Sequence, residues 1–227
     1  MKENRLKFSM PDPDALAHDI ARQAGYRSVD HAGTDVMDEV ITVCEDVFRI
    51  IHPEYVFDKT SLDSWEDGTI YGEGITIRSG NWSALLSCME SPEIICSFAV
   101  TLGKDIDREI AVNQDLFMLH AYLLDVAGSV LAEHFADQAE QHISGILDGY
   151  GYQSTKRFSP GYCDWELKDG QTNIFGFLKP DSIGLRIDSS GLMIPKKSIS
   201  AAIIGAHVIP HKTPCRFCES ECDYRRG

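Results

Sequence analysis

Residues 93–102 read EIICSFAVTL, a nearly continuous apolar run that lies between Pro92 and Gly103. An apolar run of this length, bounded by residues that interrupt regular structure, is typical of a β-strand buried on both faces. We therefore expect this segment to be the central strand of a sheet.

Two helices are predicted directly after this strand. The first is GKDIDREIAV, residues 103–112, and the second covers residues 116–147, where apolar residues recur at three- and four-residue intervals. At a rise of about 1.5 Å per residue the second helix would be about 50 Å long, enough to cross a whole domain.

Two more helices are predicted before the strand. In the first, Asp12 is suited to the N-cap and Pro13 to the first helical position, and Gly25 ends the pattern. The second runs from Thr34, as a capping residue, to about Ile51.

Shorter segments complete the pattern. The expected strands are residues 55–62, 69–78, 152–158, 183–187, 191–194 and 198–208, and the expected short helices are residues 80–88 and 171–178. Helices mostly precede strands, which favours an α+β fold with an antiparallel sheet.

Length and charge limit the possible functions. The chain has 227 residues and a formal net charge of −14, which disfavours nucleic acid and membrane surfaces as partners. No run reaches the roughly 18 apolar residues of a membrane span and the start lacks a secretion signal, so we expect a cytoplasmic protein. We expect residues 1–208 to form one domain and residues 209–227 an irregular cysteine-rich tail.

The nine residues RFSPGYCDW, 157–165, suggest a binding site. Ser159, Pro160 and Gly161 favour a tight turn whose backbone can approach a ligand closely. Arg157 offers a planar fork for a carboxylate, and Tyr162 offers a ring face for a cation or a base. S-adenosylmethionine carries a carboxylate, a sulfonium and an adenine. The alternative is that Arg157 pairs with a surface carboxylate and that the turn merely connects strands.

The same segment resembles the R-x3-G-Y signature of the S-adenosylmethionine-binding activation domain of cobalamin-dependent methionine synthase. The resemblance extends from about residue 26 to residue 205. It includes, in the order found in stand-alone relatives of that domain, the segments VTLGKDIDREI, LLDVAGSVLAEHFAD, RFSPGYCDW and GLMIPKKSISAAIIG.

This resemblance implies a C-shaped α+β domain with a bent antiparallel sheet, flanked by helices that include one long helix. S-adenosylmethionine would lie extended along a groove. Arg157 would hold the methionyl carboxylate, the backbone of Ser159, Pro160 and Gly161 would contact the ligand, and Tyr162 would lie near the reactive methyl group.

Other positions of the family pattern are matched only in part. Ser198 and Ser200 match a P-x-x-S-x-S segment and are candidates for a supporting role, as is Cys163, which is also suited to simple packing or to a redox role. Gly151 stands where the full-length enzyme has a glutamate, and Ile203 stands in the place of a second tyrosine. The ligand affinity, or the geometry around the methyl group, is therefore expected to differ.

The family function is reactivation. Cobalamin that is oxidised to inert cob(II)alamin is reduced again and trapped by methylation from S-adenosylmethionine. This chain has no D-x-H-x-x-G motif for a cobalamin ligand, so we expect the cobalamin on a separate methionine synthase and an electron donor such as flavodoxin or ferredoxin. The chain would then be the activation component of this methyltransferase in methionine biosynthesis.

The sequence leaves two alternatives open for the function of the chain. The partner can be the corrinoid protein of a different methyltransferase. The chain can also be a non-catalytic iron–sulfur or zinc interaction module that retains the fold.

The tail carries Cys215, Cys218 and Cys222 in a C-x2-C-x3-C pattern. Thiolates at this spacing can bind one zinc ion or ligate an iron–sulfur cluster, and we favour the cluster because reductive activation needs an electron. Both groups normally take four ligands, so His207, His211 or Cys163 could complete the set, or a partner could. The alternative is a flexible tail with reduced thiols.

Overall fold

The apolar run of residues 93–102 lies at the centre of an antiparallel sheet in the computed structural model. The structure describes residues 6–26 and 33–222; residues 1–5, 27–32 and 223–227, which include the end of the expected tail, lie outside the described residues. The six strands are ordered β3-β2-β1-β4-β8-β5. Their bounds are β1 Glu54–Glu66, β2 Thr69–Gly72, β3 Ile75–Arg78, β4 Glu90–Thr101, β5 Gln153–Ser154 and β8 Ser198–Val208.

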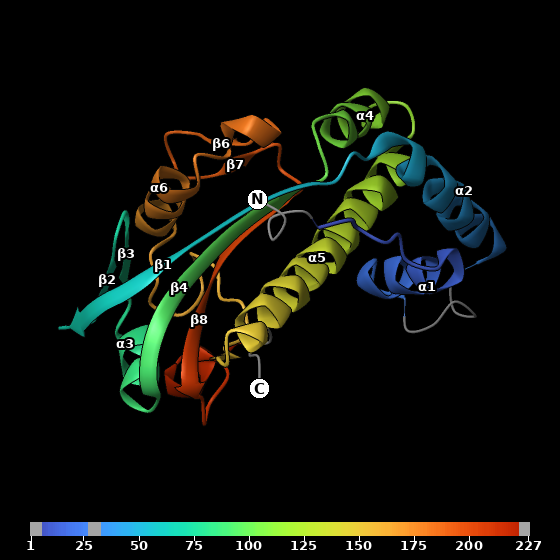
Figure 1. Ribbon diagram of the computed structural model, residues 1–227. Helices are drawn as coiled ribbons and strands as arrows, with labels where there is room; N and C mark the ends of the chain where they lie inside the picture. Colours follow the sequence, from blue (N-terminus) through green and yellow to red (C-terminus); the bar gives the residue numbers. More distant parts are fainter. Residues whose placement is uncertain (1–5, 27–32, 223–227) are drawn as a thin grey trace.

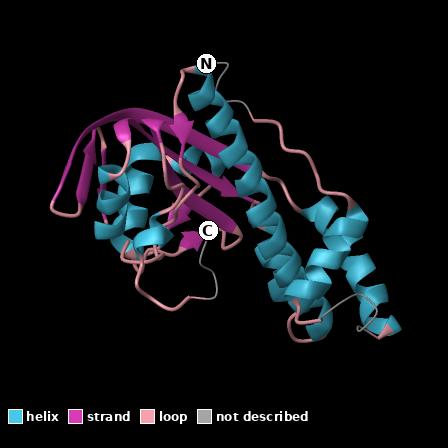
Figure 2. Cartoon of the chain, turned by 90° about the horizontal axis from the view of Figure 1, so that it is seen from below, coloured by secondary structure: helices cyan, strands magenta, loops and turns pink. Residues whose placement is uncertain are grey.

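Helices cover both faces of this sheet. The α-helices are α1 Pro13–Gln23, α2 Thr34–Ile50, α3 Gly80–Ser87, α4 Asp105–Asn113, α5 Met118–Gly149 and α6 Leu167–Leu178. Helix α5 crosses one face, with α1 and α2 packed outside it (Figure 1). The shorter helices α3 and α6 lie on the other face of the curved sheet (Figure 2).

The central strand β4 is buried on both faces, as its sequence predicts. Cys96 and Phe98 belong to the core that contains α1, α2 and α5, which we call the α5-side core. Ile95 and Ala99 belong to the core that contains α3 and α6, which we call the α6-side core. Successive side chains of a strand point to opposite faces, so a nearly continuous apolar run supplies both cores at once.

All the predicted helices are present, but the one expected at 171–178 begins four residues earlier, at Leu167, and the cap of another differs. Helix α1 begins after Asp12, whose carboxylate accepts hydrogen bonds from the N–H groups of Asp14 and Ala15, both at 3.1 Å. The long helix α5 has 32 residues. The N-cap of α2 is Gly33 rather than Thr34, and it makes no side-chain hydrogen bond.

Three strand predictions need correction. Residues 69–78 form the hairpin β2–β3 because Gly74, with φ +80°, reverses the chain. The expected strand at 183–187 begins as part of a 3₁₀ turn, Pro180–Ile183, and leaves only β6, Arg186–Ile187, which pairs with β7, Met193–Ile194, in a separate small sheet.

The expected strand at 152–158 is also shorter than its sequence pattern suggests. Only β5 pairs regularly with β8. Beyond it, the Thr155 N–H still donates to Ile204 and Phe158 forms an isolated bridge with Ala202, whereas the Lys156 N–H donates to the carbonyl of Lys212 at 2.7 Å. Beyond β5 the segment therefore stays beside β8 with irregular pairing and also bonds to the tail.

The part of the tail that the structure describes packs against the body of the domain. A 3₁₀ turn, η3 Pro214–Phe217, begins after Thr213, whose hydroxyl accepts the N–H of Cys215 at 3.2 Å. Cys215 is buried in the α6-side core. Within the described residues, no helix is long and apolar enough to span a bilayer.

Candidate functional site

The RFSPGYCDW segment, residues 157–165, comes shortly after β5 in the chain, lies beside β8 at Phe158 and then folds into a compact turn. Phe158 forms an isolated antiparallel bridge with Ala202 of β8. The N–H of Gly161 donates to the carbonyl of Trp165 at 2.7 Å, which closes the turn. Gly161 has φ +93°, a left-handed conformation that glycine adopts without steric cost. The predicted turn is therefore present, and a glycine occupies the position that needs one.

Aromatic packing anchors both ends of this turn in the α6-side core. Phe158 and Trp165 are stacked, with ring centroids 6.2 Å apart and an angle of 8° between the rings. Trp82 of α3 meets them edge-on, with centroid distances of 5.6 Å to Phe158 and 6.4 Å to Trp165. These three rings are almost completely buried, so the residues between them are held on a rigid base.

Asp164 ties the turn to the N-terminus of α3. Its carboxylate accepts hydrogen bonds from the Ser79 hydroxyl at 2.5 Å and from the Asn81 N–H at 3.2 Å. Partial burial opposes ionisation, but these hydrogen bonds outweigh it and lower the pKa of Asp164. The ionised carboxylate is thus a structural link between the turn and the helix.

Arg157 points away from the aromatic anchor, toward α5, and its side chain is only 4% exposed. Its guanidinium donates to Glu133 at 2.5 Å, to Glu140 at 2.9 Å, and to Asp137. Glu140 is also buried, whereas the side chains of Glu133 and Asp137 are 50% and 60% exposed. The guanidinium therefore has one buried partner and two that can move into solvent.

Helix periodicity brings these three acids together. Positions 133, 137 and 140 are four and three residues apart, so their side chains lie on one face of α5. Burial of the guanidinium opposes its ionisation, but the three carboxylates outweigh this effect and raise the pKa of Arg157. Sequence reasoning missed these partners, although the spacing of acids beside an apolar stripe was a usable signal.

Several of the predicted ligand-binding residues lie together. Arg157, Ser159 and Tyr162 line a small cavity of about 10 Å³, together with Glu133 and Ile199. This volume is too small for a nucleotide, but Glu133 and Ile199 also line a cavity of about 750 Å³. The two cavities therefore adjoin, and the larger one is in the size range of small-molecule sites.

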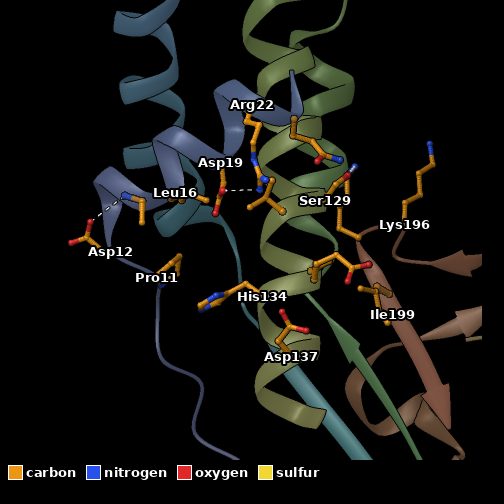
Figure 3. Close-up of a pocket in the computed structure, with 17 residues that line it drawn as sticks. Pro11, Asp12, Leu16, Asp19, Arg22, Ser129, His134, Asp137, Lys196 and Ile199 are labelled. Carbon is orange, nitrogen blue, oxygen red and sulfur yellow. Dashed lines mark hydrogen bonds and ion pairs between the residues drawn. The ribbon is translucent and has the colours of Figure 1, made fainter. Parts of the chain in front are cut away.

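The larger cavity lies between α1, α5 and the start of β8 (Figure 3). Charged side chains of both signs line it, namely Asp12, Asp19, Arg22, Glu133, Asp137, Lys196 and Lys197. Arg22 is paired with Asp19 at 3.0 Å, and Lys197 with Asp125 of α5 at 2.8 Å. Sequence reasoning did not place α1 beside the site, because that contact depends on how distant segments pack.

The side chains of Ser198 and Ser200 point to the same face of β8, because the two residues are two positions apart in a regular strand. Ser198 lines the larger cavity, and its hydroxyl lies 2.8 Å from Thr101 Oγ1. Ser200 faces α6, and its hydroxyl donates to Gln171 at 2.8 Å. Pro160 also lies on the α6 side, so close to Gly170 that a Cβ there would be 2.7 Å from it. Ser200 and Pro160 thus contact α6 rather than α5.

The two departures from the family pattern have local explanations. Gly151 follows α5 with φ +84°, a conformation that is strained for glutamate. Ile203 is fully buried in the α5-side core. Neither residue lines the cavity at Arg157.

Four cysteines surround a third cavity, of about 210 Å³. Cys163, Cys215, Cys218 and Cys222 line it, together with Tyr162, Ser220 and Glu221. It adjoins the cavity at Arg157, because Tyr162 and Cys215 line both. Desolvation, and then hydrogen bonding with Cys218, raises the pKa of the Cys163 thiol.

The structure also bears on which residue could complete a metal site. His207 stacks on Tyr152 and His211 meets Phe217 edge-on, and neither lines the cysteine cavity. The seven cysteines, all within the described residues, form no disulfide. Among residues 6–26 and 33–222, no group of three or more His, Cys, Asp or Glu side chains is arranged to hold a metal ion. The predicted site for a metal at the tail cysteines thus stays a prediction.

Comparison with known proteins supports the fold. No protein-family model matches the chain, and no curated protein matches it. Among solved structures, the chain is similar to a crystal structure of the MetH reactivation domain bound to AdoHcy, with a TM-score of 0.54. The likeness covers 91% of this chain and 72% of that chain, at 14% sequence identity.

At this identity the likeness establishes a shared fold. The chain has the α+β architecture of a methionine synthase reactivation domain, with a six-stranded antiparallel sheet flanked by helices. The predicted fold class is therefore confirmed.

Proposed function

We propose that this chain binds S-adenosylmethionine and supports the reductive methylation of cob(II)alamin on a separate cobalamin-dependent methionine synthase. The main support is one combination of features. The fold is shared with a domain bound to AdoHcy, and on this fold Arg157, Glu133 and Tyr162 line a single small cavity that shares Glu133 and Ile199 with a larger one.

The charges at this cavity suit the amino-acid end of the ligand. Arg157 offers its fork to the carboxylate, and Glu133 is an acceptor for the ammonium group. The half-exposed Glu133 and Asp137 can release the guanidinium at low cost because exposed ion pairs are weak. Buried Glu140 would keep its bond to Arg157 and orient it.

The surplus of negative charge favours the sulfonium form of the ligand. One guanidinium faces three carboxylates, and Lys156 lies 3.2 Å from Glu140. S-adenosylmethionine carries one more positive charge than AdoHcy. We therefore expect the substrate to bind more tightly than the product, which assists product release.

In the proposed reaction the S-methyl group passes to cobalt as cob(II)alamin takes up one electron, and AdoHcy is left. The chain's own task is to orient the ligand and to exclude water, with Ser159 and the ring of Tyr162, which line the cavity at Arg157, facing the ligand. The cobalamin would come from the partner enzyme, and the electron from a donor such as flavodoxin or ferredoxin. Such a chain would act in the cytoplasm.

Titration calorimetry with S-adenosylmethionine and AdoHcy tests the binding site. We expect Arg157→Lys to weaken binding of either ligand at least about tenfold, because lysine keeps the charge but not the fork. Arg49→Lys is the matched control, since Arg49 is an exposed arginine of α2 with two carboxylate partners. Absence of binding to the wild type, or equal binding by all three proteins, would contradict the proposal.

A second experiment tests the partner. The chain is mixed with a cobalamin-dependent methionine synthase that lacks its activation domain, and with a chemical reductant. We expect the methylcobalamin absorption spectrum only when both this chain and S-adenosylmethionine are present. If methylation occurs only with a different corrinoid protein, that alternative replaces the methionine synthase. If the ligand does not bind at all, the interaction-module alternative is favoured.

A further inference from the structure

The cysteine cavity brings together two segments that are far apart in the sequence. Cys163 comes from the ligand-binding turn, and Cys215, Cys218 and Cys222 come from the tail. Sequence spacing joined only the last three and left the fourth ligand open. In the structure the fourth cysteine is the residue directly after Tyr162.

The backbone at Cys163 is a second and independent sign of function. Cys163 has φ +50°, in the left-handed region that residues other than glycine rarely adopt. Such strained residues concentrate at functional sites, where the surrounding structure holds them in place. Here the closed turn and the buried ring of Trp165 supply that restraint.

The volume of the cysteine cavity favours a cluster over a single ion. Zinc draws its four ligands to about 2.3 Å from one point. A four-iron cluster instead places an iron and a sulfide at each corner of a cube, so its four thiolates stay farther apart. A cavity of about 210 Å³ lined by four cysteines has room for an iron–sulfur cluster between the thiols, and not only for a single metal ion.

We propose that Cys163, Cys215, Cys218 and Cys222 ligate a [4Fe–4S] cluster, which occupies this cavity. The cluster links the tail to the turn and lies next to Tyr162, which also lines the cavity at Arg157. It therefore fixes the position of the turn that the proposed function assigns to S-adenosylmethionine. The cysteine site itself does not depend on that assignment.

Anaerobic reconstitution of the full chain with ferrous iron and sulfide tests the site. The measurements are bound iron, acid-labile sulfide and zinc per chain, the visible absorption of the cluster, and the electron paramagnetic resonance spectrum after reduction. We expect about four irons and four sulfides per chain in the wild type. We expect Cys163→Ser and Cys222→Ser to lose most of the iron and to lose or alter the resonance.

The choice of variants separates ligation from folding. Cys163 and Cys222 are exposed, so serine at either position leaves the core intact, and circular dichroism verifies this. Cys88→Ser is the matched control, because Cys88 is exposed and is not among the residues that line the cavity. This control is expected to retain all of its iron.

Three results would overturn the inference. They are a wild type without iron, a wild type with about one zinc and no sulfide, and a Cys163→Ser variant with an unchanged cluster. Calorimetry with AdoHcy on the same samples keeps this test separate from that of the proposed function. Ligand binding without iron would refute only the cluster, and iron without ligand binding would refute only the binding proposal.

Discussion

Replacing Arg157 by methionine should strongly destabilise the folded chain, apart from any effect on a ligand. Methionine preserves much of the length of the side chain and removes the guanidinium. Three carboxylates on α5 then lose their contact with the guanidinium. Two of them, Glu133 and Asp137, can be hydrated where they stand, but Glu140 is only 8% exposed.

The size of the loss follows from this difference in burial. The pairs with Glu133 and Asp137 resemble surface ion pairs, worth about 0–1 kcal/mol each. Breaking a buried pair costs about 3–5 kcal/mol, and Lys156, 3.2 Å from Glu140, reduces that cost. We therefore expect a net loss of about 3 kcal/mol, which lowers the melting temperature by about 6–12 °C in a chain of this length.

Urea unfolding followed by circular dichroism measures this loss, with Arg49→Met as the control. Arg49 also faces two carboxylates, at 3.4 and 3.5 Å, but is 70% exposed, so its replacement should cost less than about 1 kcal/mol. The double variant Arg157→Met with Glu140→Leu should recover part of the stability, because no buried charge is left. Equal destabilisation by the two methionine variants, or strictly additive effects in the double variant, would refute the reasoning.

Three further predictions concern the support of the site. Gly170→Ala should destabilise the chain by about 1–3 kcal/mol in thermal melts, because its Cβ would lie 2.6 Å from Trp165 Nε1. Gly176→Ala in the same helix, whose Cβ meets nothing within 4 Å, should stabilise the chain by up to about 1 kcal/mol in the same melts. Ile203→Tyr should lower the stability of the fold by about 1–3 kcal/mol, since Ile203 is fully buried in the α5-side core. It should not tighten S-adenosylmethionine binding in calorimetry, and tighter binding would show that the side chain reaches the ligand. Asp164→Asn should cost about 1 kcal/mol of stability at neutral pH. Because the folded pKa of Asp164 is lowered, the wild type has this stability above the unfolded pKa of about 4 and loses it as the pH falls through the folded pKa. Urea titrations at several pH values should therefore show the stability difference between wild type and variant closing in acid.

Local sequence patterns predicted helix and strand ends well where a single residue type is enough to begin or end the element. Asp12 caps α1 because its side chain reaches the next two N–H groups. The pattern failed at residues 155–158, where pairing with β8 becomes irregular and the Lys156 N–H bonds to Lys212 of the tail. An alternating segment can form a strand only if a partner strand is free to pair with it.

The sequence by itself determined the central strand, the long helix and the turn at Gly161, because the period of apolar residues and the need for positive φ are local properties. The resemblance of four sequence segments, in the same order, to the activation domain also led to the fold class, which the solved structure of a reactivation domain supports. The tertiary structure alone decided which charges surround Arg157 and which cysteine joins the tail. These relations depend on the packing of α5 and of residues 213–222 against one turn, and no spacing along the chain encodes the distance between segments that meet only after folding.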